Sequence, residues 1–392
     1  MENFTSWTPT RVFFGEDTEK NTGKYVKEAG GSRVLIVYGG GSVKRSGLLD
    51  RVKDSLDSEG LYFEEFGGAR PNPTLGHARE GVKKAIAMNA DLILAIGGGS
   101  TIDTAKAIAH GRANPEIDIW DFWQGKVHLT KTSMVGAVLT IPAAGSEMSD
   151  SAVLTDEETH QKRGINTDLN RCVFAVMNPR LAMTLPDRQL ANGITDIMMH
   201  TMERYFIPDS DCDLTDEIAE GLLRTMIKNG PAVMKDHNDY HAMAEIMWCS
   251  SLSHNGLTGL GRNKDFSVHA LGQALGGRYD FTHGETLSAV WTAWALYLLH
   301  RGNALMRFAR FGRRVWGAEG SDEDAAISGI EKTRAFFQLL GMPVNLSELG
   351  INPDDKVCME LAMDATRNDK RALSQIVPLH ASDVAEIFRN AR

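Results

Sequence analysis

The fold is most readily inferred from ten residues, Asp91-Leu92-Ile93-Leu94-Ala95-Ile96-Gly97-Gly98-Gly99-Ser100. The first six form an apolar run of strand length, and residues 101–110 continue with a helical pattern. A buried strand, a glycine turn and a helix form the repeating unit of a parallel α/β sheet. Glycines lack a β carbon, so a phosphate can approach the N–H groups at the start of the helix. A simple tight turn capped by Ser100 would have the same pattern.

Similar units lie on both sides of this stretch. Apolar runs cover residues 34–38, 61–63, 135–141 and 173–176, and helical patterns cover residues 48–56 and 74–88. Strands that are apolar throughout and alternate with helices are typical of a parallel sheet covered on both faces. We therefore predict a doubly wound, Rossmann-like α/β domain. A second turn, Gly39-Gly40-Gly41-Ser42, follows the first strand, and two such turns favour a dinucleotide at the strand ends.

The second half of the chain has no further strand signal. Pro179 and Pro186 mark a boundary, and apolar residues then recur with helical spacing up to residue 389. A chain of 392 residues is also long for a single core. We predict a dinucleotide-binding α/β domain over residues 1–185 and an all-helical, metal-binding and catalytic domain over residues 186–392.

Four side chains in the predicted helical domain could bind a metal. Asp196 and His200 are four residues apart, so a helix places them on one face, and His269 and His283 follow. One carboxylate and three imidazoles form a complete set of ligands for a divalent metal such as zinc or iron. An ordinary ion pair on a helix would have the same Asp–His spacing, so the spacing alone does not establish the site.

Composition and charge exclude several classes of protein. The net charge is −9 and no basic stripe is visible, which argues against nucleic acid as a partner. The four cysteines form no CxxC pair and are expected to be reduced thiols in the cytoplasm. The first residues show no signal-peptide pattern. Residues 287–299 form the longest apolar stretch, which is too short to span a bilayer, so we expect no membrane association.

Several motifs together resemble the iron-containing alcohol dehydrogenase family over nearly the whole chain. They are Phe13-Phe14-Gly15, similar to the family's opening β-hairpin, Pro71-Asn72-Pro73-Thr74, the turn at residues 97–100 with Asp103 and Lys106, Gly145-Ser146-Glu147, and His283-Gly284. Asp196, His200, His269 and His283 fall in the contexts of the family's four metal ligands. The chain most resembles the NADPH-dependent aldehyde reductases and butanol dehydrogenases of the family.

The resemblance implies a dehydroquinate synthase-like architecture, a homodimer, and reversible hydride transfer between NADP(H) and a primary alcohol or aldehyde. Fe(II) or Zn(II), held by the four ligands above, would act as a Lewis acid on the carbonyl group. The resemblance also gives Asp103 a catalytic role near the nicotinamide. The residues expected to contact the cofactor are Gly39, Gly40, Ser42, Asn72, Gly98, Gly99, Ser100, Asp103, Thr140, Ser146 and Lys162.

Three positions depart from the family pattern. Gly39 stands where many NAD-dependent members have an aspartate, and Lys44 and Arg45 follow it, so we expect a preference for NADPH. Ala144 stands where a threonine or serine often precedes the Gly-Ser-Glu turn. Gln273 replaces a histidine that could carry a proton, so a ribose hydroxyl and a water chain become the expected proton source.

Other functions are also considered. One is an NAD-dependent polyol dehydrogenase of the glycerol or propanediol type. Another is a dehydroquinate synthase-like lyase, but the helical half shows no basic cluster near the ligands for its phosphorylated substrate. A nucleotide-binding module without catalysis would not need the complete set of metal ligands.

Overall fold

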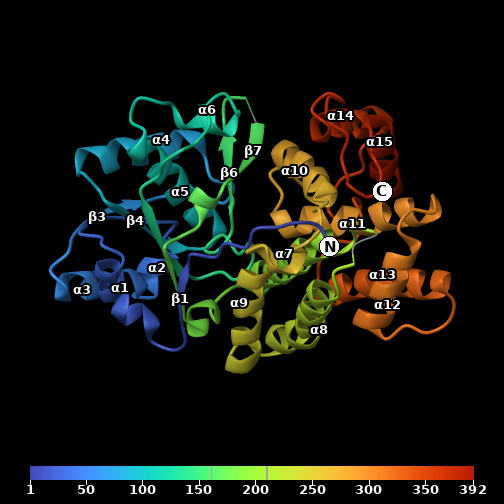
Figure 1. Cartoon of the computed structure of the whole chain (residues 1–392), viewed down its shortest axis with the longest axis horizontal. Coiled ribbons are helices and arrows are strands. Elements are labelled where there is room, and N and C mark those ends of the chain that lie inside the picture. Colours follow the sequence, from blue (N-terminus) through green and yellow to red (C-terminus); the bar gives the residue numbers. More distant parts are fainter. Residues whose placement is uncertain (160, 209–210) are drawn as a thin grey trace. The chain divides into compact units, whose positions relative to one another are not determined.

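The computed structural model describes residues 1–159, 161–208 and 211–392, which form two compact units (Figure 1). Trp7–Thr184 form an α/β unit, and Leu185–Arg392 form a helical unit together with Met1–Ser6. The parallel sheet and the helical second half confirm the predicted fold class. The first six residues do not group with the α/β domain in which the sequence analysis placed them, because the Glu2 backbone N–H donates to the Gly261 carbonyl at 2.8 Å.

The α/β unit is built on a six-stranded parallel sheet with the order β1-β8-β5-β4-β2-β3. Its strands are β1 (Arg11–Phe14), β2 (Arg33–Tyr38), β3 (Tyr62–Gly67), β4 (Leu92–Gly97), β5 (Met134–Leu139) and β8 (Phe174–Met177). Every residue of β4 is buried. This burial explains why the central strands are apolar on both faces rather than alternating.

Helices cover both faces of this sheet. They are α1 (Thr22–Glu28), α2 (Ser42–Arg45), α3 (Leu48–Ser58), α4 (Leu75–Ala87), α5 (Gly99–Ala113) and α6 (Ile119–Trp123), with short 3₁₀ turns at Thr18–Asn21, Asp168–Asn170 and Pro179–Ala182. Val34 and Ile36 of β2 share one core cluster with Val52 of α3. Ala78 of α4 and Ala107 of α5 belong to a second cluster. Figure 1 shows α1 and α3 on one side of the sheet and α4 to α6 on the other.

The order of the strands reverses between β2 and β4. The chain passes from β2 outward to β3, and then returns to place β4 on the other side of β2. Tyr38 pairs with Ile96 and Gly97 pairs with Leu139, so the carboxyl ends of β2, β4 and β5 lie at one edge. Such a switch point is where open parallel sheets bind their ligands, and the two glycine turns flank it.

Two features of the α/β unit differ from the sequence analysis. Phe13-Phe14-Gly15 does not open a hairpin as the resemblance suggested, because β1 is an edge strand that pairs in parallel with β8, Arg11 opposite Phe174. The chain instead forms a hairpin that was not predicted, from β6 (Ser151–Asp156) and β7 (Gln161–Asn166).

The second unit is helical, as the spacing of apolar residues in the second half of the chain predicted. Its helices are α7 (Asp187–Tyr205), α8 (Asp213–Lys235), α9 (Tyr240–His254), α10 (Ser267–Tyr279), α11 (His283–His300), α12 (Leu305–Trp316), α13 (Asp322–Leu339), α14 (Asp355–Ala365) and α15 (Ala381–Asn390), with a 3₁₀ turn at Leu257–Gly259. α8 continues through Pro231. None of the helices described here is both long enough and apolar enough to cross a membrane.

Candidate metal centre

Helix α7 carries the first two predicted metal ligands on a buried face. All of its residues from Leu190 to Tyr205 are buried. Asp196 and His200 lie four positions apart, so their side chains stand above one another. The helix therefore presents a carboxylate and an imidazole to the interior of the unit rather than to solvent.

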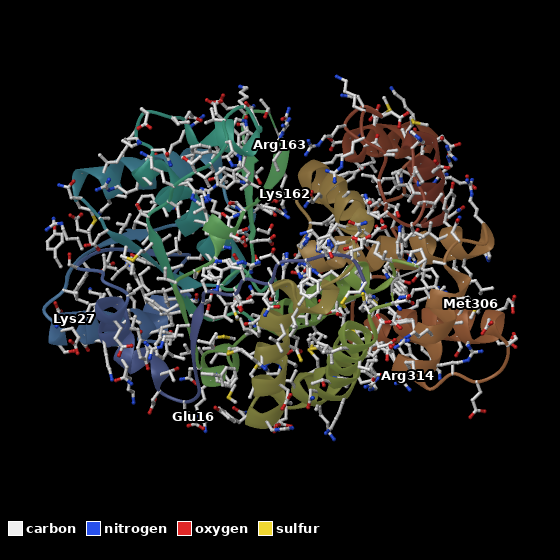
Figure 2. The ribbon with its side chains drawn as sticks, in the orientation of Figure 1. Glu16, Lys27, Lys162, Arg163, Met306 and Arg314 are labelled. Carbon is white, nitrogen blue, oxygen red and sulfur yellow. The ribbon has the colours of Figure 1, made fainter. Side chains whose placement is uncertain are left out.

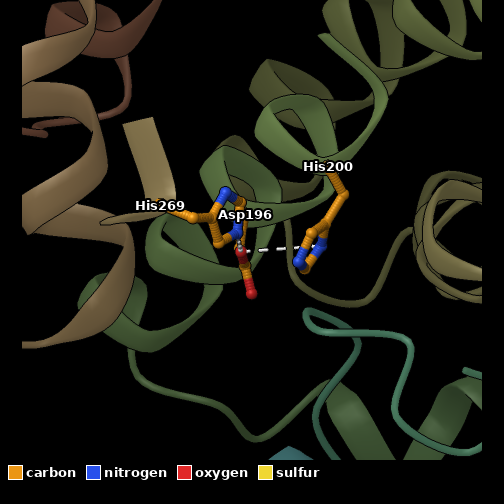
Figure 3. Close-up of side chains that lie close together, drawn as sticks. All are labelled: Asp196, His200 and His269. Atoms are coloured by element: carbon orange, nitrogen blue, oxygen red, sulfur yellow. Dashed lines mark ion pairs between the residues drawn. The ribbon is translucent and has the colours of Figure 1, made fainter. Parts of the chain in front are cut away.

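His269 and His283 reach Asp196 from two other helices. The Oδ1 atom of Asp196 lies 3.6 Å from His200 Nδ1, 3.5 Å from His269 Nε2 and 3.8 Å from His283 Nε2. The side chains of Asp196, His200 and His269 point toward one another in Figure 3. Their potential ligand atoms all lie within 4.8 Å of one another. The fold thus brings together four residues that span 88 positions, counted from 196 to 283.

These atoms fit a metal ion. Asp196 Oδ1, His200 Nδ1 and His269 Nε2 are buried and have no hydrogen-bond partner among the described residues. Buried polar atoms are rarely left without a partner. Two ligands at about 2.1 Å from a tetrahedral ion would be about 3.4 Å apart, close to the separations observed here. A divalent cation at their centre would satisfy all three atoms at once.

His283 is placed by the close approach of α11 to α7. It is the first residue of α11, and its side chain is 30% exposed, more than the other three. A β carbon on the next residue, Gly284, would lie 2.6 Å from the Asn192 carbonyl oxygen. The Asn192 side chain accepts a hydrogen bond from the Glu285 N–H at 3.0 Å. The structure therefore explains why glycine follows His283, because only a residue without a β carbon lets the start of α11 lie against α7.

The surroundings of the site shift the pKa values of His200 and His269 in opposite directions. Burial lowers the pKa of His200 well below its usual value, and the neighbouring imidazoles lower it further. Burial also opposes protonation of His269, but the carboxylates of Glu203 and Asp196 together outweigh it and raise the pKa of His269 to about 9. Neutral imidazole is the form that binds a metal, and His200 is held in it.

The sequence analysis missed two residues beside these ligands. Glu203 is buried on α7, and its carboxylate contacts the His269 ring. It lies three positions after His200, so helical spacing could have placed it on the same side. The ring of His254, at the end of α9, lies 3.9 Å from the ring of His200. No sequence signal indicated this contact, because nothing in the spacing links the two helices.

The predicted phosphate turn begins α5 at the end of β4. Gly98 precedes the first helical residue, Gly99. A β carbon on Gly98 would lie 2.9 Å from Ile141 Cβ, and one on Gly99 would lie 3.2 Å from Ala144 Cβ. The Thr140 N–H donates to the Gly97 carbonyl at 3.0 Å, which ties the β5 end to this turn. Glycine thus permits close backbone packing at the start of α5.

Asp103 and Ser146 are engaged with the protein itself. Asp103 accepts hydrogen bonds from Ser146 Oγ at 2.6 Å and from the Val153 N–H at 2.9 Å. Burial raises the pKa of Asp103, while the nearby Lys106 opposes that rise. Lys106 is fully buried and donates to Ser146 Oγ at 2.9 Å. These bonds fix the Gly-Ser-Glu turn and the start of β6, which is a structural role that the sequence analysis did not foresee.

The remaining predicted cofactor residues lie in the α/β unit. Asn72 has a positive φ of 56° and accepts a hydrogen bond from Lys162 Nζ at 2.8 Å. This bond joins the Pro-Asn-Pro-Thr turn to β7. Lys162 is labelled in Figure 2. Gly39 is half-buried at the end of β2, and Gly40 and Ser42 are exposed beside it. Ser100 is half-buried in the first turn of α5.

Comparison with known families covers both units. The model of the iron-containing alcohol dehydrogenase family matches residues 9–179. The model of the C-terminal part of the same Fe-containing family matches residues 190–392. Together the two matches extend over most of the chain.

Individual relatives agree with these matches. The chain is 39% identical to NADH-dependent butanol dehydrogenase A of Clostridium acetobutylicum, covering 100% of both chains. It is 38% identical to an NADPH-dependent aldehyde reductase of Escherichia coli, covering 90% of each. The crystal structure of NADH-dependent butanol dehydrogenase A from Thermotoga maritima matches with a TM-score of 0.95 at 34% identity, covering 100% of this chain and 99% of that one.

Proposed function

The chain belongs to the iron-containing alcohol dehydrogenase family, and we propose that it is a metal-dependent aldehyde reductase that uses NADPH. It is an oxidoreductase of the alcohol dehydrogenase type, and its family implies a divalent metal and a nicotinamide cofactor. In the proposed reaction an aldehyde, NADPH and a proton give a primary alcohol and NADP⁺. The observation that carries the proposal is the group of three buried ligand atoms without hydrogen-bond partners on α7 and α10.

We assign the metal to Asp196, His200, His269 and His283. A divalent ion there would polarise the carbonyl group as a Lewis acid, and the nicotinamide would supply the hydride. The one carboxylate and three imidazoles would leave the ion a net positive charge, which this chemistry needs. Gln273 cannot deliver a proton at neutral pH, so the proton would come through the cofactor ribose and water.

We assign the cofactor to the switch point of the sheet. The pyrophosphate would lie over Gly98, Gly99 and Ser100 at the start of α5, where the helix dipole favours an anion. Asn72 and Lys162 would contact the cofactor as a bonded pair, and Thr140 would line the β5 end. Asp103 and Ser146 would support this surface through the bonds that hold the Gly-Ser-Glu turn.

The preference for NADPH is proposed from the end of β2. Gly39 carries no side chain, so nothing negative would repel a 2′-phosphate there. Lys44 lies 5.1 Å from the centre of the Tyr38 ring, and its Nζ is 3.9 Å from Glu65. Glu65 is already paired with Lys53 at 2.8 Å, so the net charge of Lys44, Lys53 and Glu65 together is positive. The named relatives include both NADH- and NADPH-dependent enzymes, so the choice depends on such local residues.

The cofactor preference can be measured with butanal as substrate. We expect kcat/KM for NADPH to exceed that for NADH by at least about tenfold, which is ~1.4 kcal/mol. Gly39→Asp should reduce or reverse this ratio, because a carboxylate would meet the 2′-phosphate. Gly39→Ala is the matched control, since its β carbon would lie 3.3 Å from the Ala69 carbonyl without adding charge.

Two results would contradict the proposed preference. One is equal efficiency of the wild-type protein with both cofactors. The other is the same cofactor ratio in Gly39→Asp and Gly39→Ala.

The family resemblance also supports a homodimer, and the four buried free cysteines are consistent with a cytoplasmic location. Light scattering of the purified protein would test the homodimer.

A further inference from the structure

We propose that Glu203 is a positioning residue that holds the His269 ring in the tautomer able to bind the metal. The inference rests on the proposed metal centre and adds to it a residue outside the ligand set. Glu203 does not reach the centre itself. It contacts Nδ1 of the His269 ring, the nitrogen that does not face Asp196.

The geometry around Glu203 is specific. Its side chain is fully buried on α7, and its Oε1 accepts the His269 backbone N–H at 3.1 Å. Its Oε2 contacts His269 Nδ1. The His269 N–H lies in the first turn of α10, where a helix leaves its N–H groups without intrahelical partners. One carboxylate therefore fixes both the start of α10 and the edge of the ring.

The chemistry of these contacts determines the tautomer. An ionised carboxylate only accepts hydrogen bonds, so Nδ1 must carry the hydrogen that points at Oε2. When a metal ion displaces the proton from Nε2, the single remaining N–H is at Nδ1 and Nε2 offers its lone pair to the ion. That Nε2 atom is the one that lies 3.5 Å from Asp196 Oδ1 and has no hydrogen-bond partner. Carboxylates behind metal-binding histidines have this effect in many metal sites.

Replacement of Glu203 by glutamine gives a sharp test. An amide offers one acceptor and one donor, so it cannot accept both hydrogen bonds from His269. The backbone N–H cannot change its protonation, so the amide oxygen should turn to it. The NH₂ group would then face Nδ1 and favour the tautomer with hydrogen on Nε2, which blocks the metal. The side chain keeps nearly the same shape.

The experiment measures metal affinity rather than activity. The full chain is stripped of metal with a chelator and titrated with Zn(II) or Co(II) against a chromophoric competitor. We expect Glu203→Gln to bind roughly 10- to 100-fold more weakly than wild type, and its Co(II) absorption bands to change. Glu220→Gln is the matched control, because Glu220 is equally buried but bonds to Tyr205 and Arg310 instead.

The outcomes separate this inference from the proposed metal centre. If wild type and Glu203→Gln bind metal equally tightly, Glu203 has only a structural role and the inference is wrong. The same conclusion follows if Glu220→Gln loses as much affinity as Glu203→Gln. If the wild-type protein itself binds no metal, the ligand assignment fails before the role of Glu203 is reached.

A second measurement needs no change at Glu203. Zinc-loaded wild-type protein labelled with ¹⁵N-histidine reports which ring nitrogen carries hydrogen, and His269→Ala identifies the signal. We expect the hydrogen of His269 on Nδ1. A His269 ring without hydrogen on Nδ1 would overturn the inference even if Glu203→Gln does not fold.

Discussion

At the scale of single residues, the proposed metal centre depends mainly on side chains that the folded protein buries. Asp196, His200 and His269 are buried, while His283 is partly exposed at the start of α11. The sequence could propose all four from their types and contexts. It could not show that Asp196 Oδ1 faces three ring nitrogens, because these contacts depend on how α7, α10 and α11 pack.

The role of His283 can be tested against another histidine of the same helix. His283→Ala should remove most of the bound metal and nearly all turnover while the fold stays intact, because the ion would lose one of four ligands. His300→Ala is the control, since His300 is exposed at the other end of α11. Metal analysis and circular dichroism of both variants provide the comparison. Normal metal content and turnover in His283→Ala would show that the assignment is wrong.

His110 should make stability depend on pH. Its ring is fully buried between Thr132 and Asn170, and burial lowers its pKa to about 4. The unfolded chain would bind a proton near pH 6.5 while the folded protein would not. The stabilising contribution is therefore complete above pH 6.5 and lost as pH falls toward 4, by up to about 3 kcal/mol.

Urea unfolding of wild type and His110→Gln at pH 7 and pH 4.5 measures this effect. The wild-type protein should be the more stable at pH 7, and its advantage should shrink at pH 4.5. A gap between the two proteins that is the same at both pH values would count against this account.

At the scale of elements, the sequence predicted the parts that have strong local patterns. The apolar runs of β2, β4 and β5 and the helical spacing of α7 to α15 were visible without knowledge of partners. The β6–β7 hairpin was missed because Gln161-Lys162-Arg163-Gly164 is polar and gives no strand signal. β1 was misassigned because its partner, β8, lies far away along the chain. Pairing partners of this kind become known only from the folded structure.

The turn between β4 and α5 provides a test of the proposed cofactor site. Gly99→Val should weaken NADPH binding, because its β carbon would lie 3.2 Å from Ala144 Cβ and its branches would push the backbone away from a phosphate. The metal content should not change, since the proposed ligands lie on α7, α10 and α11. Fluorescence titration with NADPH and metal analysis on the same sample test both statements. Unaltered NADPH affinity would place the pyrophosphate elsewhere.

At the scale of the whole molecule, the proposed function assigns a different part of the chemistry to each unit. The α/β unit has the strand order and glycine turns of a nucleotide-binding sheet. The helical unit contains all four proposed metal ligands. The sequence predicted this division because the change from alternating strands and helices to helices alone is visible along the chain. It did not predict that Met1–Ser6 would group with the helical unit.

The central claim is that one divalent ion, bound by Asp196, His200, His269 and His283, is required for reduction of an aldehyde by NADPH. The most direct measurement follows the nicotinamide absorbance with butanal and NADPH in chelator-treated protein, before and after addition of one equivalent of Fe(II) or Zn(II). We predict no turnover in protein shown to be free of metal, and recovery with one equivalent of an active ion. Undiminished turnover in metal-free protein would contradict the account.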